Sequence, residues 1–398
     1  MKKINNLLMM ALLTIGMGLT SCDEQLDNAV TPYTPGVTPE SEVAVTSITL
    51  DKTVLRIDKY NTIETLKATV SPAEATDKTV TWKSSDETVA TVDANGQVTP
   101  IKAGTVTIEA TAGDKTATST VYVYDEIYAI SDIDITKNAL AGKSYLFTSN
   151  GTPLDTKINI EDGATVTLKG INITNQIACD GNATIILADG SENTVTVSTS
   201  GKAGIQIGGT GTTLTINAET AGTGTLTAKG GSDGAGIGTS MNETGGNIVI
   251  NGGTVTATGG SDAAGIGTGD AYGSTSTNKC DAITINGGTV IATGGKYGAG
   301  IGTGNVNYKT NECGDITIKA NVTSVTATKG TDSPNSIGKG KTGGGTQKCG
   351  TITFGTAAVF DGSAWSPATM VAGTYGDLKL VISKKNDDDD TWTLTPAE

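Results

Sequence analysis

The amino-acid sequence predicts an all-β protein in which a small β-sandwich precedes a right-handed parallel β-helix, a three-sided solenoid. Three observations predict this fold. Val, Ile and Thr recur in short alternating runs, glycine accounts for 54 of the 398 residues, and the chain repeats itself after residue 124. Because β-branched residues in runs of period two favour strands over helices, we expect almost no α-helix after the leader.

The N-terminus has the order of charges and apolar residues that marks a secretory signal peptide. Lys2 and Lys3 precede an apolar stretch, residues 7–18, and small residues lead to Cys22. This stretch of about a dozen residues is shorter than the ~20 that a membrane span needs. The Leu-Thr-Ser-Cys run resembles the lipobox of bacterial lipoproteins, which implies removal of the signal peptide 1–21 and acylation of Cys22. An ordinary secretory leader with an incidental cysteine is the alternative.

Residues 22–44 are predicted to be a flexible tether, because they are rich in Thr, Pro, Glu and Val without periodicity. The acidic cluster 23–27 is similar to the export signal of lipoproteins on the outer face of Gram-negative cells. We therefore expect a protein in the cell outer membrane, surface-exposed and held to the membrane by its lipid anchor, with the periplasmic face as the alternative. Several acyl chains together hold a soluble domain firmly to a membrane, because each buried CH₂ contributes ~0.8 kcal/mol to the binding free energy.

The charge of the chain excludes nucleic acid as a partner. The formal net charge is −14, and Arg56 is the only arginine. Nucleic-acid binding depends on clustered Lys and Arg that neutralise phosphates. We expect no nucleic-acid contact and a monomer.

Residues 45–124 read as a compact sandwich of short alternating strands separated by turn clusters. The sequence here resembles the bacterial Ig-like group 2 family. The matching runs are LKATVSP (66–72), VTWKSSD (80–86), VATVD (89–93), GQVT (96–99) and AGTVTI (103–108). The resemblance implies a stalk or adhesive module of a surface protein without catalytic residues, and it makes Trp82 a core residue.

From residue 125 onward the chain repeats a three-part unit with a period of about 35 residues. A strand of the type apolar-Thr-apolar starts at Leu214, Ile248, Ile283, Ile316 and Ile352. Segments of the types Thr-Val-Thr-Ala-Thr and Gly-Ala-Gly-Ile-Gly follow in each unit, joined by Gly-Gly corners. Three strands and no helix-length run predict a three-sided coil over 125–398. Propeller blades, the main alternative, need four strands.

In such a solenoid each strand pairs in parallel with its copy one coil away, so equivalent side chains stack ~4.8 Å apart. We expect Ile, Val and Ala to point inward, Thr outward, and Asn217, Asn251 and Asn286 to form an amide ladder. A longer excursion leaves the same corner of each coil, and these excursions should form one face of stacked loops, the usual place for function. The excursions are residues 239–247, 268–282, 303–315 and 339–351. The last segment, with Trp365 and Trp392, is predicted to cap the solenoid.

Three cysteines, Cys280, Cys313 and Cys349, each lie three residues before their strand. On adjacent coils they would fall within the ~4.4–6.8 Å between Cα atoms that a disulfide needs, and export permits oxidation. We predict one bridge, between neighbours, that leaves the third cysteine and Cys179 reduced. A ladder of buried thiols is the alternative.

The candidate ligand-binding residues are acidic and aromatic. Asp233 and Asp262 share one offset in the repeat, and as stacked like charges they either splay into water or share a cation such as Ca²⁺. We expect no other cofactor. Tyr272 and Tyr308 lie in excursions and Tyr297 at a corner, where their rings could pack against sugar rings or simply against the loops.

The repeat elements INGGTVxATGG and GAGIG resemble the carbohydrate-binding β-helix domains, pectate-lyase-like in fold, of bacterial surface lipoproteins. The resemblance implies binding of a polysaccharide or surface glycan, sometimes with calcium. We expect no enzyme, because the chain has no histidine and no lysine amid clustered carboxylates. A structural or adhesive protein that binds host or bacterial protein is the alternative, followed by a polysaccharide lyase. Ice binding by the outward threonine rows is disfavoured, because Lys229, Ile291 and Ser324 interrupt them.

Overall fold

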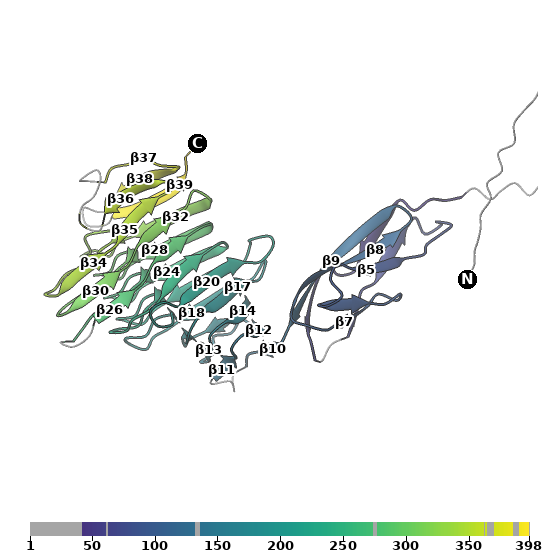
Figure 1. Ribbon diagram of the computed structural model, residues 1–398, viewed down its shortest axis with the longest axis horizontal. Coiled ribbons are helices and arrows are strands. Elements are labelled where there is room, and N and C mark those ends of the chain that lie inside the picture. Colours follow the sequence, from purple (N-terminus) through teal and green to yellow (C-terminus); the bar gives the residue numbers. More distant parts are fainter. Residues whose placement is uncertain are drawn as a thin grey trace, which may run out of the picture. The chain divides into compact units, whose positions relative to one another are not determined.

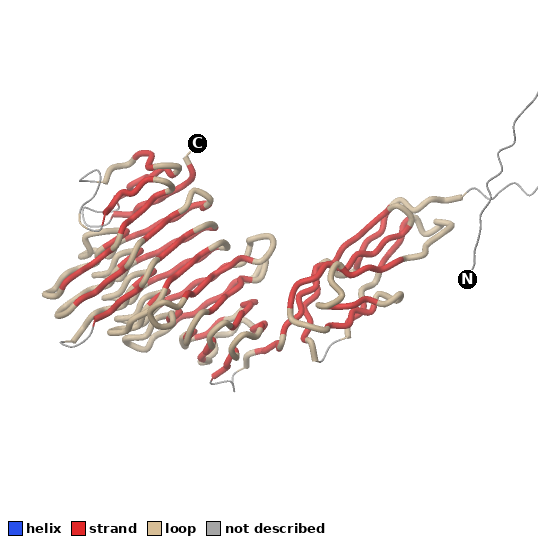
Figure 2. Tube along the Cα trace, in the orientation of Figure 1, coloured by secondary structure: helices blue, strands red, loops and turns tan. Residues whose placement is uncertain are grey.

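The computed structural model describes residues 42–60, 63–131, 136–273, 277–361, 363, 370–384 and 390–397. Every regular element in these ranges is a strand, which confirms the predicted all-β fold (Figure 2). No helix within them is long and apolar enough to cross a membrane. The predicted signal peptide, Cys22 with its predicted acylation, and Trp365 lie outside the described residues.

The first strands form the Ig-like domain. One sheet contains β2 (Val54–Asp58), β9 (Lys115–Tyr124), β8 (Gly104–Ala112) and β5 (Thr81–Ser84), another contains β3 (Glu64–Thr65), β7 (Gln97–Pro100) and β6 (Ala90–Val92), and β1 (Ser47–Leu50) pairs with β4 (Ala68–Ser71). Alternate residues of β8 are buried, including Val106 and Ile108, and they pack with Leu66 and Val121. Trp82 packs half-buried against this core, as predicted.

Three long sheets form the β-helix, and their strands lie as parallel rungs (Figure 1). The first contains β10 (Glu126–Ala129), β12 (Ser144–Thr148), β14 (Ala164–Lys169), β17 (Ala183–Leu187), β20 (Thr213–Ala218), β23 (Asn247–Ile250), β27 (Ile283–Ile285), β31 (Ile316–Ile318), β35 (Thr351–Phe354) and β36 (Ala357–Asp361). The second contains β15 (Asn172–Ile173), β18 (Glu192–Thr196), β21 (Thr225–Lys229), β24 (Thr254–Thr258), β28 (Gly288–Thr293), β32 (Val322–Thr328), β39 (Asp390–Pro396), β38 (Leu378–Lys384) and β37 (Gly373–Tyr375). The third contains β11 (Thr136–Ala139), β13 (Lys157–Ile160), β16 (Ile177–Cys179), β19 (Ile205–Gln206), β22 (Ile237–Gly238), β25 (Ile266–Gly267), β29 (Ile301–Gly302) and β33 (Ile337–Gly338).

Equivalent residues of successive coils stack in register and build the core. Ile237, Ile266, Ile301 and Ile337 pair as parallel neighbours, and each is fully buried. Along β24 the Val and Ala side chains are buried while the Thr side chains are only half-buried, which confirms the predicted inward and outward faces. Burial of apolar surface, worth ~25 cal/mol per Å², therefore recurs at the same position of every coil.

The predicted amide ladder is present at one corner. The Nδ2 of Asn251 donates to the Oδ1 of Asn217 at 2.7 Å, and the Nδ2 of Asn286 donates to the Oδ1 of Asn251 at 2.7 Å. The middle amide, that of Asn251, uses one donor and one acceptor, so the ladder links three coils on the outside of the core.

Three of the four excursions differ from the predicted loops, because part of each of these three is a strand. β26 (Thr277–Cys280), β30 (Thr310–Cys313) and β34 (Thr346–Cys349) form a further parallel sheet. The fully buried amide of Asn311 helps to fix the backbone around these strands. Its Nδ2 donates to the carbonyls of Gly269 at 2.9 Å and Asn305 at 2.8 Å. Asn278 does the same for the carbonyls of Ser240 and Asp270. These bonds satisfy backbone groups that would otherwise be buried without partners.

Antiparallel strands end the parallel stack. β36 pairs antiparallel with β35, and β39 pairs antiparallel with β32. Trp392 of β39 is 7% exposed, and its ring lies edge-on to that of Phe354, with 6.4 Å between centroids. This arrangement agrees with the cap expected at the C-terminal end, where an open edge of the sheet would otherwise be exposed.

The three cysteines of the repeat stack as neighbours across β26, β30 and β34. All four described cysteines are buried and free in the structure, so the bridge stays a prediction. The neighbouring Cys280 thiol and burial raise the pKa of Cys313 well above its ordinary value. Burial raises the pKa of Cys349 and of Cys179 to about 12.

A glycine column tests the in-register stacking. Gly267 has φ +132°, and a Cβ built on it would lie 1.9 Å from the carbonyl oxygen of Gly302 on the next coil. We expect Gly267→Ala to lower the free energy of unfolding by more than about 4 kcal/mol, because backbone atoms must move apart. Gly209→Ala is the control, since a Cβ there meets no atom within 4 Å, and it should change stability by less than about 0.5 kcal/mol. Equal melting curves of the two variants by circular dichroism would contradict the stacking.

The thiols can be counted. Because the thiolate is the reactive species, all four thiols are buried, and the pKa values of Cys179, Cys313 and Cys349 are raised, we expect the native protein to react negligibly with a thiol reagent at pH 8. After unfolding in guanidinium, the predicted bridge leaves two reactive thiols among Cys179, Cys280, Cys313 and Cys349. Unfolding with a reductant, followed by its removal under acid, should give four. Four thiols without reductant would exclude the bridge.

Candidate functional site

A pocket of about 270 Å³ opens among the turns and excursions of successive coils. Its lining consists of Asp233, Met241, Asp262, Asp270, Tyr272 and Asn307. Asp233 and Asp262 lie in corner turns of two adjacent coils, whereas Asp270 and Tyr272 belong to the excursion that follows β25. The pocket thus combines one aromatic ring with three carboxyl groups and an amide.

Backbone hydrogen bonds set the path of each excursion. The amide of Asp270 donates to the carbonyl oxygen of Asp233 at 2.9 Å, and one coil further the amide of Asn305 donates to the carbonyl oxygen of Asp262 at 2.6 Å. The excursion of each coil is therefore fixed to the corner turn of the coil before it. This pattern brings Asp270 beside Asp233, although 37 residues separate them in sequence.

The two aspartates singled out by the sequence accept hydrogen bonds from serines. The Oδ2 of Asp233 accepts from the hydroxyls of Ser200 at 2.5 Å and Ser232 at 2.9 Å, and the Oδ2 of Asp262 accepts from Ser261 at 2.6 Å. Both aspartates are half-buried and line the one pocket. Within the described ranges, no group of three or more acidic, thiol or imidazole side chains has an arrangement suited to a metal ion. Calcium at Asp233 and Asp262 stays a prediction.

Asp270 is the functional candidate that sequence reasoning missed. Its side chain is 3% exposed, and its Oδ1 has no hydrogen-bond partner. Burial, followed by the negative charges of Asp262 and Asp233, raises the pKa of Asp270 to about 7. The signal available in the sequence was weak, because the equivalent position of the next coil is Asn305 and no acidic motif recurs there.

The structure brings together two of the three tyrosines. Tyr272 and Tyr308 lie on excursions of adjacent coils with 5.8 Å between ring centroids and 75° between ring planes, and they are 55% and 59% exposed. Tyr297 is half-buried at its corner, with the ammonium groups of Lys296 and Lys341 at 4.9 and 4.3 Å from its ring centroid. Tyr272 and Tyr308 therefore form an exposed aromatic pair beside the pocket, whereas Tyr297 is occupied by lysines.

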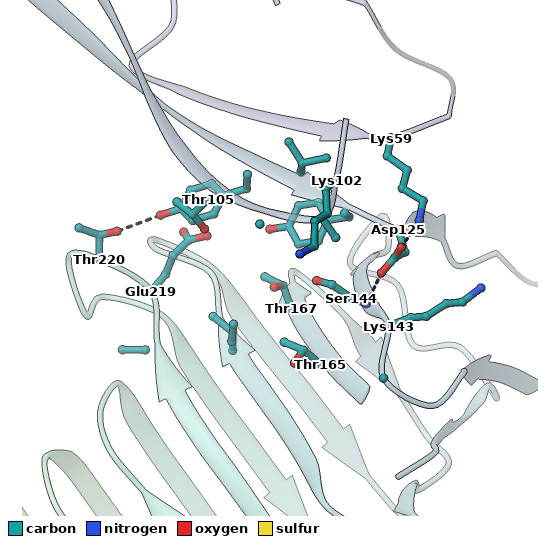
Figure 3. Close-up of a pocket in the computed structure, with 18 residues that line it drawn as sticks. Lys59, Lys102, Thr105, Asp125, Lys143, Ser144, Thr165, Thr167, Glu219 and Thr220 are labelled. Carbon is teal, nitrogen blue, oxygen red and sulfur yellow. Dashed lines mark hydrogen bonds and ion pairs between the residues drawn. The ribbon is translucent and has the colours of Figure 1, made fainter. Parts of the chain in front are cut away.

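A larger pocket, of about 790 Å³, is lined by residues of the Ig-like domain and of the early coils (Figure 3). Several of its polar groups have partners within the chain. Glu219 forms an ion pair with Arg56, Lys59 lies 2.5 Å from Asp125, and the hydroxyls of Tyr122 and Thr220 are 2.9 Å apart, whereas the Oε1 of Glu219 and the hydroxyl of Tyr124 are buried without a partner. We favour the smaller acidic pocket as the ligand site because the exposed pair of Tyr272 and Tyr308 lies beside it.

Comparisons with known families agree with this architecture. The family model for the bacterial Ig-like domain (group 2) matches residues 44–123, and the family model for the beta helix repeat matches residues 248–270 and 283–305. The first segment of the second match contains Asp262 and Asp270.

Similar proteins share short regions with this chain. An uncharacterized protein of Clostridium acetobutylicum is 36% identical over 119 residues, which are 29% of this chain and 12% of that protein. An alpha-L-arabinofuranosidase of Bifidobacterium longum is 63% identical over 46 residues, 12% of this chain and 4% of that protein. A lacto-N-biosidase of Bifidobacterium bifidum is 37% identical over 109 residues, 27% of this chain and 9% of that protein. Each match thus spans a small part of a relative.

The predicted order of the two folds is confirmed by the family matches and the sheet topology together. This chain contains a bacterial Ig-like domain (group 2) followed by a parallel β-helix built from beta helix repeats.

Proposed function

We propose that this protein is a bacterial cell-surface lipoprotein that binds carbohydrate through the excursion face of its β-helix and catalyses no reaction. The observation that carries the proposal is the exposed Tyr272–Tyr308 pair beside the pocket of Asp233, Asp262 and Asp270. Exposed aromatic rings beside clustered hydrogen-bond acceptors are the combination that suits a sugar ring.

The chemistry of this surface suits a saccharide. The C–H faces of a sugar ring are apolar and pack on an aromatic ring, while its hydroxyls donate to carboxylate and amide oxygens. The pocket, at about 270 Å³, lies at the lower end of the ~300–1,000 Å³ of ligand sites. One sugar unit of a longer chain would occupy the pocket, and neighbouring units would lie along the tyrosines.

Two further observations support the proposal. Two of the similar proteins are named as glycosidases, so modules like those of this chain occur in proteins that act on sugars. The lipobox-like run before Cys22 supports lipid anchoring, and the acidic residues behind it support display on the outer membrane surface. In this arrangement the Ig-like domain serves as the stalk and the β-helix as the binding module.

Glycoside hydrolysis is a second candidate, favoured by one observation. The pKa of Asp270 is raised to about 7, and two further carboxyl groups line its pocket. A protonated acid near an ionised carboxylate is the arrangement that glycosidases use. Incubation of any bound oligosaccharide with the protein, followed by chromatography of the products, separates this candidate from binding alone.

The tyrosine pair provides the test. We expect the mature soluble chain to bind a polysaccharide on a glycan array, and Tyr272→Ala with Tyr308→Ala to weaken that binding about tenfold or more, because each ring stacked on a sugar is worth about 1 kcal/mol. Calorimetric titration with the polysaccharide found on the array measures the loss.

Tyr60→Ala is the matched control. Tyr60 is 71% exposed and belongs to the Ig-like domain, so its loss should leave the affinity unchanged. Equal affinity of the double tyrosine variant and the unmodified protein would place the site elsewhere. Adhesion to cells or matrix proteins without any glycan binding would favour the adhesive alternative.

A further inference from the structure

We infer that the pocket of Asp233, Asp262 and Asp270 binds the ammonium group of an amino sugar, so that the carbohydrate ligand carries free amines rather than neutral or acidic units. The inference rests on the proposed carbohydrate function and names the class of sugar. It depends on the charge of the pocket, on a buried oxygen without a partner, and on the position of Tyr272.

The charge of the pocket is unbalanced. Three aspartates line it together with Met241, Tyr272 and Asn307, and none of these six side chains is basic. On the neighbouring turns, Lys202 lies 3.9 Å from Glu243, and these opposite charges offset one another. An anionic sugar would be repelled here, whereas a cation would be attracted by all three carboxyl groups.

A buried carboxylate oxygen needs a donor. Only 3% of the surface of Asp270 is exposed, and its Oδ1 has no hydrogen-bond partner. In contrast, Asp233 and Asp262 have serine hydroxyls as donors. Leaving a buried polar atom without a hydrogen bond is unfavourable, so the Oδ1 of Asp270 marks the place where a ligand donor would gain most.

An ammonium group fits these acids better than a metal ion does. A metal draws its ligands within about 2.0–2.6 Å, and the described residues contain no group of three acids so arranged. An ammonium donates three hydrogen bonds at about 2.8 Å to oxygens that lie further apart. The exposed ring of Tyr272 adds a surface for the sugar and for the cation, since ammonium groups are attracted to aromatic faces.

The protonation of Asp270 is linked to such binding. Burial and the charges of Asp262 and Asp233 raise the pKa of Asp270 to about 7. A bound ammonium stabilises the ionised carboxylate and lowers that pKa, so binding should release a proton near neutral pH. The affinity is therefore expected to fall as the pH decreases below 7.

The experiment compares two ligands that differ at each sugar in whether the nitrogen is a free amine or is acetylated and uncharged. The mature chain is titrated calorimetrically with a β-1,4-linked glucosamine tetrasaccharide and with its fully N-acetylated counterpart, at pH 7 and low salt. We expect the amine-bearing tetrasaccharide to bind at least about tenfold tighter, and added salt to reduce this difference.

A pair of variants locates the effect. Asp270→Asn keeps the shape of the side chain but removes its charge, and we expect it to abolish most of the preference for the amine and the loss of affinity below pH 7. Asp180→Asn removes the same charge from an exposed position outside the pocket and should retain the preference. Melting curves of both variants verify that they are folded.

The outcomes separate this inference from the proposed function. Equal binding of the two tetrasaccharides, or a preference that survives Asp270→Asn, overturns the amino-sugar inference and leaves carbohydrate binding intact. Absence of binding to any oligosaccharide on the array overturns both. Asp270-dependent binding of CaCl₂ alone, or of a lysine peptide as tightly as the amine-bearing tetrasaccharide, would show that the acids serve a different cation.

Discussion

In-register pairing between successive coils is the constraint on which the rest of the β-helix depends. Each strand hydrogen-bonds to its copy one coil away, so a residue at one position lies directly against its equivalent. An apolar position then produces a continuous core, as in the column that includes Ile266 and Ile301. A polar position must instead find a partner in its own column, as Asn251 does with Asn217. The same rule therefore selects both the core residues and the outer ladders.

This constraint becomes unfavourable where the repeated residue is charged. Asp233 and Asp262 are held on adjacent coils, and serine hydroxyls offset part of the repulsion between them. Asp270 enters the same region from an excursion, and its carboxyl group is buried with one oxygen unpaired. The Nδ2 of Asn311, by contrast, donates to two backbone carbonyls. Among the described residues whose buried side chains carry an unpartnered polar atom, Asp270 combines that atom with two neighbouring negative charges in a pocket, and departures of this kind are expected at functional sites.

Stacked excursions also explain how a simple repeat can support specific recognition. The core tolerates little variation, because equivalent backbones lie within hydrogen-bonding distance and a Cβ on Gly267 would meet the next coil. Outside the recurring strands β26, β30 and β34, the excursions differ in sequence from coil to coil, while hydrogen bonds to the preceding corner fix their path. Side chains of different character can therefore be placed side by side, such as the Tyr272–Tyr308 pair and the acids next to it.

Period and alternation are enough to predict the repeat, the three strands of each coil, the inward and outward faces and the Asn217–Asn251–Asn286 ladder, and the Ig-like runs are recognised by their resemblance to a family. Which excursion residues meet is a property of the folded chain. The amide of Asp270 bonds to the carbonyl of Asp233 across coils, and β26, β30 and β34 turn expected loops into a sheet. Neither follows from the period, since both depend on the path of non-repeating segments and on buried amides that fix their backbone. The lysine neighbours of Tyr297 could likewise not be predicted from the period, because they come from two different coils.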